Sequence, residues 1–348
     1  MTSLIRWNDD DKPKLWVKSP AEQRIEELER LMARAEWRKA FDLALELQKE
    51  GLDHSAIDTS LAVGFQERML FSQAFEAASR AIEKDPENTV APFYLIRAAR
   101  GLGYKKLAAE LAVTTKTSDL DKLLFDAKVA LESSDFAATE RYASDALSIS
   151  PKSETALTYY HSGRWHGSKN LESRDELERM YMEDGCTFAG RRLALGYELN
   201  GEFDSALQAW HRYFKLDSDP RDPFPFCAMV RVVYGMKGPE AALREIQFLP
   251  PSIIGLPEVL FQKAWFLDKA GRLKEAEEVC WKLIELSPVD SRIVRFTSYV
   301  LRRRRRWFAF FRLAKIMRSR WQGANAKLWK EISESMDKDL KGWIRSSK

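Results

Sequence analysis

The sequence predicts an all-α protein, built as a solenoid of about nine helix–turn–helix units. Small or apolar residues recur at intervals of 31 to 36 residues along most of the chain. Around each of them, apolar residues are spaced three and four apart, which is the period of an amphipathic helix. Glycine and proline also fall at fixed places in the units. Glycine marks the point where one helix turns into the next, and proline marks the point where the second helix stops.

The residue that recurs in every unit serves as its reference position. In chain order the reference positions are Ala40, Ala74, Ala108, Thr139, Ser173, Ala206, Ala242, Ala276 and Phe310. Four residues later every unit has another apolar residue. Five residues before the reference position, three units have a glycine: Gly103, Gly201 and Gly271. Twelve residues after it, three units have a proline: Pro86, Pro151 and Pro288. Each unit is therefore expected to hold two amphipathic helices.

This pattern resembles the tetratricopeptide repeat family, whose unit is a 34-residue helix–turn–helix. The resemblance covers roughly residues 21–323 and is strongest over residues 260–288. It is weakest near Ser173, where polar residues stand at packing positions. It implies a right-handed α-solenoid in which the small reference residue lets two helices approach closely. Pentatricopeptide repeats have a similar length and bind RNA, but the glycine and proline positions favour the tetratricopeptide alternative.

The ends of the chain predict three parts: an N-terminal tail over residues 1–19, a repeat array over residues 20–323, and a capping helix with a basic tail over residues 324–348. Ser19 and Glu22 form the pattern of a capping box, with Pro20 at the first helical position. A solenoid exposes an apolar face at its last unit, which needs a cover. Two proline-rich joints, at residues 218–226 and 248–257, predict firm bends.

Nothing in the sequence predicts catalysis, a cofactor or a metal site. His161 and His166 do not share a helical face, and no cysteine pair has zinc-site spacing. A catalytic role would require the fifth unit to form a pocket around His161, His166 and Glu172. The three cysteines are odd in number and far apart, and no secretory or membrane-spanning segment is recognised. We therefore expect a non-enzymatic, cytoplasmic protein.

The family resemblance implies a concave groove, lined by the first helix of each unit, in which partner segments lie. The side chains that this geometry places in the groove are Trp165, Arg191, Arg231, Tyr234, Trp265, Arg295 and Tyr299. Arginine pairs with carboxylates and stacks on rings, so this lining suits an acidic or aromatic-bearing protein segment. The alternative is that about half of these residues only pack between helices.

The charge of the chain is asymmetric. From residue 291 to the end there are 17 Lys+Arg and 4 Asp+Glu, a net charge of +13, whereas the first 290 residues have a net charge of −9. Five consecutive arginines are expected along one edge of the ninth unit: Arg302, Arg303, Arg304, Arg305 and Arg306. The predicted function is an adaptor that binds a partner segment in its groove and docks this basic edge to an acidic partner.

Two other partners fit the basic end. The helix after the arginines is amphipathic and could lie on an anionic membrane surface, at the inner face of a membrane and as part of an envelope or polysaccharide assembly machine. The same edge could contact RNA or DNA phosphates. The apolar face of this helix also has the period of the repeat core, and core packing is the favoured interpretation.

Overall fold

The computed structural model describes residues 18–33, 37–114, 119–216, 222–320 and Glu334. These residues contain α-helices and no strand. The helices are α1 (Pro20–Ala33), α2 (Trp37–Lys49), α3 (Ser55–Glu67), α4 (Phe71–Lys84), α5 (Ala91–Gly101), α6 (Lys105–Thr114), α7 (Asp119–Glu132), α8 (Phe136–Ile149), α9 (Glu154–Ser168), α10 (Leu171–Met182), α11 (Thr187–Leu199), α12 (Phe203–Leu216), α13 (Pro223–Lys237), α14 (Pro239–Gln247), α15 (Pro251–Ile254), α16 (Pro257–Lys269), α17 (Leu273–Leu286), α18 (Ser291–Arg303) and α19 (Trp307–Arg320).

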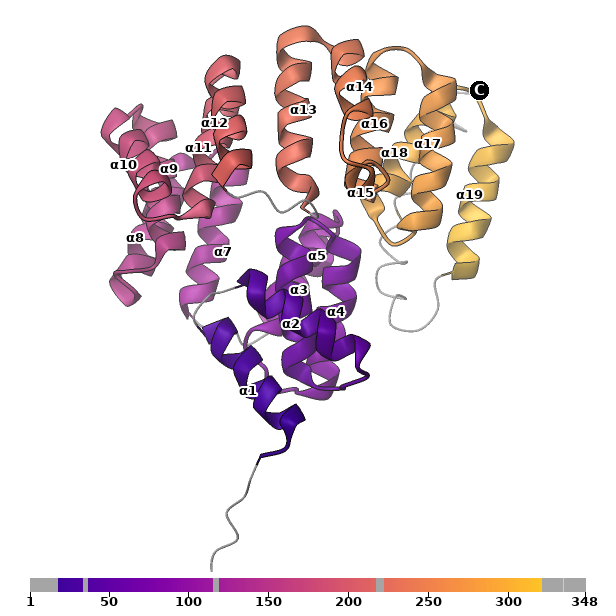
Figure 1. The fold of residues 1–348 in the computed structure, drawn as a ribbon. Helices are drawn as coiled ribbons and strands as arrows, with labels where there is room; N and C mark the ends of the chain where they lie inside the picture. The colour runs from indigo at the N-terminus through magenta and orange to yellow at the C-terminus, as the bar shows by residue number, and fades with distance from the viewer. Residues whose placement is uncertain (1–17, 34–36, 115–118, 217–221, 321–333, 335–348) are drawn as a thin grey trace, which may run out of the picture.

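Consecutive helices pair into nine hairpins over the described part of the chain. Neighbouring hairpins pack in chain order, except that the third hairpin (α5, α6) packs little against the fourth (α7, α8) and meets it through side chains such as Phe93 and Phe125. The short helix α15 lies in the second proline-rich joint, between α14 and α16. Figure 1 shows α7 to α19 arranged along an arch, with α1 to α5 forming a separate stack beneath it. The predicted all-α solenoid is therefore confirmed. Most of residues 1–19 and of residues 324–348 lie outside the described residues, so the predicted tail and capping helix stay predictions.

The reference position of each unit lies in the second helix of its hairpin, and all nine reference residues are buried. Eight of the nine are Ala, Ser or Thr, and the last is Phe310. A small buried side chain allows close packing of helices, as the sequence predicted. Even the poorly matching fifth unit follows the rule, because Ser173 on α10 is buried.

The turn between the two helices of a hairpin requires a left-handed backbone five residues before the reference position. Gly103, Gly201 and Gly271 have φ of +84°, +76° and +76° there. Three other units place a residue with a side chain at the same position, also with positive φ: Met69, Ser134 and Arg305. The conformation therefore belongs to the turn, and glycine is the residue that adopts it without steric cost.

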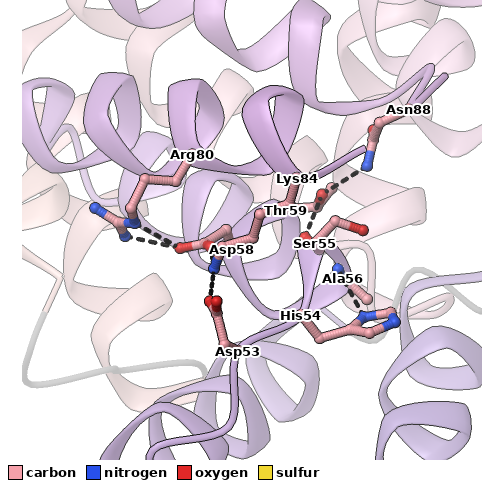
Figure 2. Close-up of polar contacts among 9 residues, drawn as sticks. All are labelled: Asp53, His54, Ser55, Ala56, Asp58, Thr59, Arg80, Lys84 and Asn88. Carbon is pink, nitrogen blue, oxygen red and sulfur yellow. Dashed lines mark hydrogen bonds and ion pairs between the residues drawn. The ribbon is translucent and has the colours of Figure 1, made fainter. Parts of the chain in front are cut away.

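Local polar contacts fix individual hairpins. At the start of α1, the Glu22 backbone N–H donates to Ser19 Oγ over 3.2 Å, and the Ser19 N–H donates to Glu22 Oε2 over 2.7 Å. This confirms the predicted capping box. In the second hairpin, the buried carboxylate of Asp58 on α3 accepts from Arg80 Nε at 2.9 Å and from Lys84 Nζ at 2.5 Å, both on α4 (Figure 2). A buried charge needs such partners.

The first hairpins also contact the far end of the array. The Ser291 N–H and Oγ donate to the Leu102 carbonyl over 3.1 and 2.5 Å, and Tyr104 Oη donates to the Val289 carbonyl over 2.5 Å. A Cβ atom added to Gly103 would lie 2.6 Å from Ser291 Oγ, so this contact needs a glycine. The turn between α5 and α6 thus meets the start of α18. The inner side of the curve is partly occupied by the protein's own N-terminal hairpins (Figure 1).

Candidate functional site

Two cavities lie where the N-terminal hairpins face the later ones. The larger has a volume of about 810 Å³ and is bounded by α2, α3, α5, α7, α9 and α11. The smaller has a volume of about 300 Å³ and is bounded mainly by α13, α16 and the start of α18, with Met69 on its N-terminal side. Cavities of this size are typical of ligand-binding sites.

The wall of the larger cavity is cationic and aromatic. Its six basic residues are Arg38, Lys39, Arg68, Arg97, Lys128 and Arg191. Its three acidic residues are Glu67, Asp121 and Asp222, so the lining has a formal net charge of +3. Its aromatic residues are Trp37, Phe93, Tyr94, Phe125, Tyr159 and Phe188. Trp37, Arg38 and Lys39 at the start of α2 are also exposed, so the cavity reaches the surface there.

Glu67, at the end of α3, lies among the cations of this cavity. Its side chain is 39% exposed although it stands deep between the hairpins, because it faces the cavity. Burial alone would raise the pKa of Glu67, but nearby cations, with Arg97 and Lys128 the strongest, hold that pKa below its usual value. Arg191 Nη1 donates to the Glu67 carbonyl over 3.5 Å, and the Arg191 guanidinium also pairs with Asp222. Arg191 is therefore held as part of the wall.

Two cations of the cavity wall, Arg97 and Lys128, and Arg192 beside that wall have donors without a close protein partner among the described residues. Arg97 Nη2 lies 3.4 Å from Glu67 Oε1, but Arg97 Nε is buried and has no hydrogen-bond acceptor. Lys128 Nζ has Glu132 Oε1 only at 3.9 Å. Arg192 lies over the rings of Tyr159 and Phe188, at 5.4 and 5.2 Å, and contacts no described carboxylate. Arg97 and Lys128 line the cavity and Arg192 lies against its wall, so an anion in the cavity would meet an excess of positive charge.

Lys128 responds strongly to this setting. Burial, with the neighbouring charge of Arg97, lowers the pKa of Lys128 to about 7. The acids Glu132 and Glu67 act in the opposite direction but do not compensate. An ammonium group that is partly neutral near physiological pH is a site where a bound anion would change the protonation state.

The smaller cavity is mainly apolar and contains one unusual carboxyl group. Phe261, Trp265 and Phe266 of α16 form much of its wall. Glu258 also lines it, and Glu258 Oε2 is buried without a hydrogen-bond partner among the described residues. Burial raises the pKa of Glu258 to about 8. The basic groups of this cavity already have partners: Arg231 bonds Glu198 at 3.0 and 3.2 Å, and Arg292 bonds Asp290 at 2.5 Å.

The structure brings together part of the predicted groove set. Arg191 lines the larger cavity, and Arg231 and Trp265 line the smaller one. Tyr234 packs edge-on against Trp265, with ring centroids 4.9 Å apart. Trp165, in contrast, is 2% exposed and stacks on His166 inside the core. Arg295 and Tyr299 are exposed on α18 and line neither cavity. Their role in partner binding stays a prediction.

The arginine run lies, as predicted, at the turn of the last hairpin. Three of its members pair with acids of the preceding hairpin: Arg303 Nη1 lies 2.5 Å from Asp268 Oδ1, Arg304 pairs with the buried Glu277, and Arg306 Nε lies 3.7 Å from Glu277 Oε1. The run is therefore partly neutralised within the fold. On α19, Phe310, Leu313 and Met317 are buried in the array, which matches the core-packing interpretation, while Phe308 is 93% exposed.

The histidines of the fifth unit lie apart from both of these cavities. His166 is buried against Trp165 and Phe136, burial lowers its pKa, and neither cavity is lined by His161, His166 or Glu172. In the described part of the chain no group of three or more His, Cys, Asp or Glu side chains could hold a metal ion. In the same part, no helix combines the length and the apolar character needed to cross a membrane.

The hairpins repeat at about 34 residues, and each buries its reference residue where the helices meet. The fold is tetratricopeptide-like. The sequence matches no protein-family model and no curated protein.

Solved structures similar to this tetratricopeptide-like chain include an APC/C hetero-tetramer Cut9–Hcn1, with 14% identity, 85% of this chain and 59% of the other chain covered, and a TM-score of 0.45. Yeast Tom70 follows with 12% identity, coverage of 84% and 67%, and a TM-score of 0.45. A tetratricopeptide repeat protein from Parabacteroides merdae has 13% identity, coverage of 80% and 99%, and a TM-score of 0.40. The chain thus spans less than two thirds of the first of these.

Glu67, Arg97 and Lys128 line the larger cavity and Arg192 lies against its wall, and none of these four was predicted from the sequence. They come from α3, α5, α7 and α11, and they meet only because the array curves back on its N-terminal hairpins. The available signal was the pair of adjacent arginines, Arg191 and Arg192, on a first helix of a unit. Only the first of them was selected.

Proposed function

We propose that the protein is a non-enzymatic scaffold that holds an acidic segment of a protein partner against the inner side of its tetratricopeptide-like array. The observation that carries this proposal is the lining of the larger cavity, where six basic side chains face three acidic ones. The aromatic residues between them suit a segment that alternates acidic and apolar side chains, because arginine and aromatic residues supply most of the binding energy in protein interfaces.

The exposed side chains at the start of α2 mark the side from which a segment would enter. Arg38 and Lys39 are exposed and belong to the cavity wall, so they would attract an acidic chain before it reaches Arg97. At the other end of the array, the arginine run would add long-range attraction. Arg305 in particular is exposed and has no ion pair with a described residue. Its contribution should fall with added salt.

Fluorescence anisotropy with labelled ten-residue peptides tests the proposal. One peptide alternates Glu and Phe, and the matched control replaces each Glu with Gln. We expect the acidic peptide to bind more tightly, and the variant Arg97→Gln to weaken it by about tenfold, the loss of roughly 1.4 kcal/mol expected for a charged hydrogen bond.

The control variant is Arg24→Gln, because Arg24 pairs with Glu46 and Glu50 on the surface of the first hairpin. Equal affinity for the acidic and the Gln peptide would refute the proposal. So would an equal loss of affinity in Arg97→Gln and Arg24→Gln, since the bound segment would then lie outside the cavity.

A further inference from the structure

We propose that the larger cavity is a receptor for a phosphate-bearing group, held by Arg97, Lys128 and Arg192. The inference rests on the proposed function in that it uses the same cavity, and it names the chemical group that binds there. The phosphate could belong to a small phosphorylated molecule or to a phosphorylated side chain of the partner segment, and the experiment below separates these two sources.

The number of unused donors favours phosphate over a single carboxylate. The Arg97 guanidinium, Lys128 Nζ and the Arg192 guanidinium come from three different helices. Arg97 has Glu67 Oε1 at 3.4 Å, and Lys128 has Glu132 Oε1 at 3.9 Å. Arg192 has no hydrogen-bond acceptor among the described residues, so all three groups keep donors to spare. A carboxylate has two oxygens, whereas a phosphate monoester offers three acceptor oxygens and nearly two negative charges. Three donor groups therefore match the three oxygens of a phosphate better than they match one carboxylate.

The charge balance gives the same answer. The three cations and Arg191 all act on Glu67, and Arg97 and Lys128 are also influenced by Glu132. Asp222 is already paired with Arg191. Glu67 and Glu132 together do not compensate Arg97, Lys128 and Arg192, and the cavity lining as a whole has a formal net charge of +3, which a bound dianion would reduce to +1. Buried or partly buried cations without enough counter-charge are costly, so filling the cavity with a dianion is favourable.

The aromatic residues of the cavity wall offer a surface against which the group that carries the phosphate can pack. Tyr159 and Phe188 lie under Arg192, while Phe93 and Tyr94 lie under Arg97 at 5.5 and 5.4 Å. These stacked contacts orient the two guanidinium planes. The cavity volume of about 810 Å³ exceeds that of a phosphate ion, so an attached ring or peptide segment can be accommodated against these rings.

Binding of the anion should be coupled to proton uptake. The pKa of Lys128 is near 7 because of burial and Arg97, and a dianion in contact with Lys128 would raise it. The other charged groups that act on Lys128 are Glu67 from α3, Arg192 from α11 and Glu132 on its own helix, and the titratable groups Tyr159 and Asp121 line the same cavity. Above pH 7 the empty cavity holds Lys128 neutral, so the anion must then bring a proton with it, and affinity must fall as pH rises.

The test uses the full chain and isothermal titration calorimetry with inorganic sulfate, which keeps the geometry of phosphate but does not titrate in this range. We expect sulfate affinity to fall by up to tenfold per pH unit between pH 7 and pH 9, with proton uptake measured in two buffers of different ionisation enthalpy. Lys128→Arg should bind sulfate without this pH dependence, because arginine stays charged. Glu67→Gln should bind it more tightly.

Inorganic phosphate and a five-residue phosphotyrosine peptide, both at pH 7, form the two further arms. Tighter binding of the peptide identifies a phosphorylated side chain as the source, and equal binding identifies a free phosphorylated molecule. The control is Lys274→Gln, which removes an exposed lysine of α17. Thermal unfolding of every variant verifies that it folds.

Two results would overturn the inference. One is a sulfate affinity that does not change with pH in the natural protein, and the other is an equal effect of Lys128→Arg and Lys274→Gln. If acidic peptides bind while sulfate and phosphate do not, the inference fails and the proposed function stands. If the anions bind and no acidic peptide does, the inference stands and the proposed function fails.

Discussion

The buried carboxyl group of Glu258 makes the stability of the fold depend on pH in a way that one substitution can remove. The pKa of Glu258 is about 8 in the folded protein because of burial, compared with 4.5 ordinarily. Between pH 4.5 and pH 8 the folded state therefore holds a proton that the unfolded state has lost. Stability contributed by this group is lost as pH rises through that window.

The magnitude follows from the two pKa values. At 1.36 kcal/mol per pH unit, the free energy of unfolding should fall by about 3 kcal/mol between pH 5 and pH 8 on account of Glu258 alone. This value is an upper limit, since water in the cavity reduces it. In Glu258→Gln the amide cannot ionise, so this part of the pH dependence should disappear. The free energy of unfolding of Glu258→Gln, relative to that of the natural protein, should therefore increase as pH rises.

Urea unfolding, followed by circular dichroism at pH 5, 6, 7 and 8, measures the effect as the difference between the two proteins. The difference between the two free energies of unfolding removes the contribution of the other titrating groups, such as Lys128, because both proteins contain them. The matched control is Glu278→Gln, which removes an exposed carboxylate on α17. If the natural protein and Glu258→Gln keep a constant difference within about 0.5 kcal/mol over this range, Glu258 is ionised and solvated in the fold, and the reasoning is wrong.

Two further predictions concern the turns and the closure of the array. Arg305 has a φ of +55° at the position where three other units have glycine. Arg305→Gly should therefore raise the free energy of unfolding by about 0.5–1 kcal/mol, whereas the control Arg302→Gly, at a helical position, should lower it. Equal effects of the two substitutions in thermal melts would contradict this prediction. The hydrogen bond from Tyr104 to the Val289 carbonyl joins the first hairpins to the start of α18. Tyr104→Phe combined with Ser291→Ala should increase amide hydrogen exchange at both contacting segments, because the free energy of local opening falls by about 1 kcal/mol for each lost hydrogen bond. Unchanged exchange there would show that the array closes without these bonds.

The repeat could be predicted from the sequence because its signals are local. Each unit's two helices, its turn and its buried reference residue depend on residues within about 34 positions of one another. Even Arg305 follows from this local rule, because the frame places it five residues before Phe310. Trp165 was misplaced in the groove set for a related reason: its position on a first helix is right, but the side chain fills the space beside Gly196, where a Cβ atom would lie 2.1 Å from its ring.

The cavities could not be predicted, because their chemistry depends on how far the array curves. That curvature is the sum of small rotations between neighbouring hairpins, so it cannot be inferred from the identity of any single residue. Only after the turn at Gly103 meets Ser291 do Glu67 and Met69 face α11 and α13. A charge count along the sequence found the basic C-terminal end, yet Arg303, Arg304 and Arg306 are paired with Asp268 or Glu277. Local charge density was therefore a poor guide to where unused charge lies.

The two cavities differ in the sign of the charge that burial leaves uncompensated. In the larger one, cations exceed acids and Lys128 is driven toward its neutral form, while in the smaller one Glu258 is driven toward its neutral form. Neither Lys128 nor Glu258 has enough opposite charge around it in the protein without a ligand. Replacing either residue with one that cannot ionise should therefore stabilise the fold in the absence of a ligand. A residue that lowers the free energy of unfolding of the protein alone is better tolerated where binding of a partner stabilises the folded state by a similar amount. The larger cavity, which also reaches the surface at α2, is therefore the better candidate for the functional site.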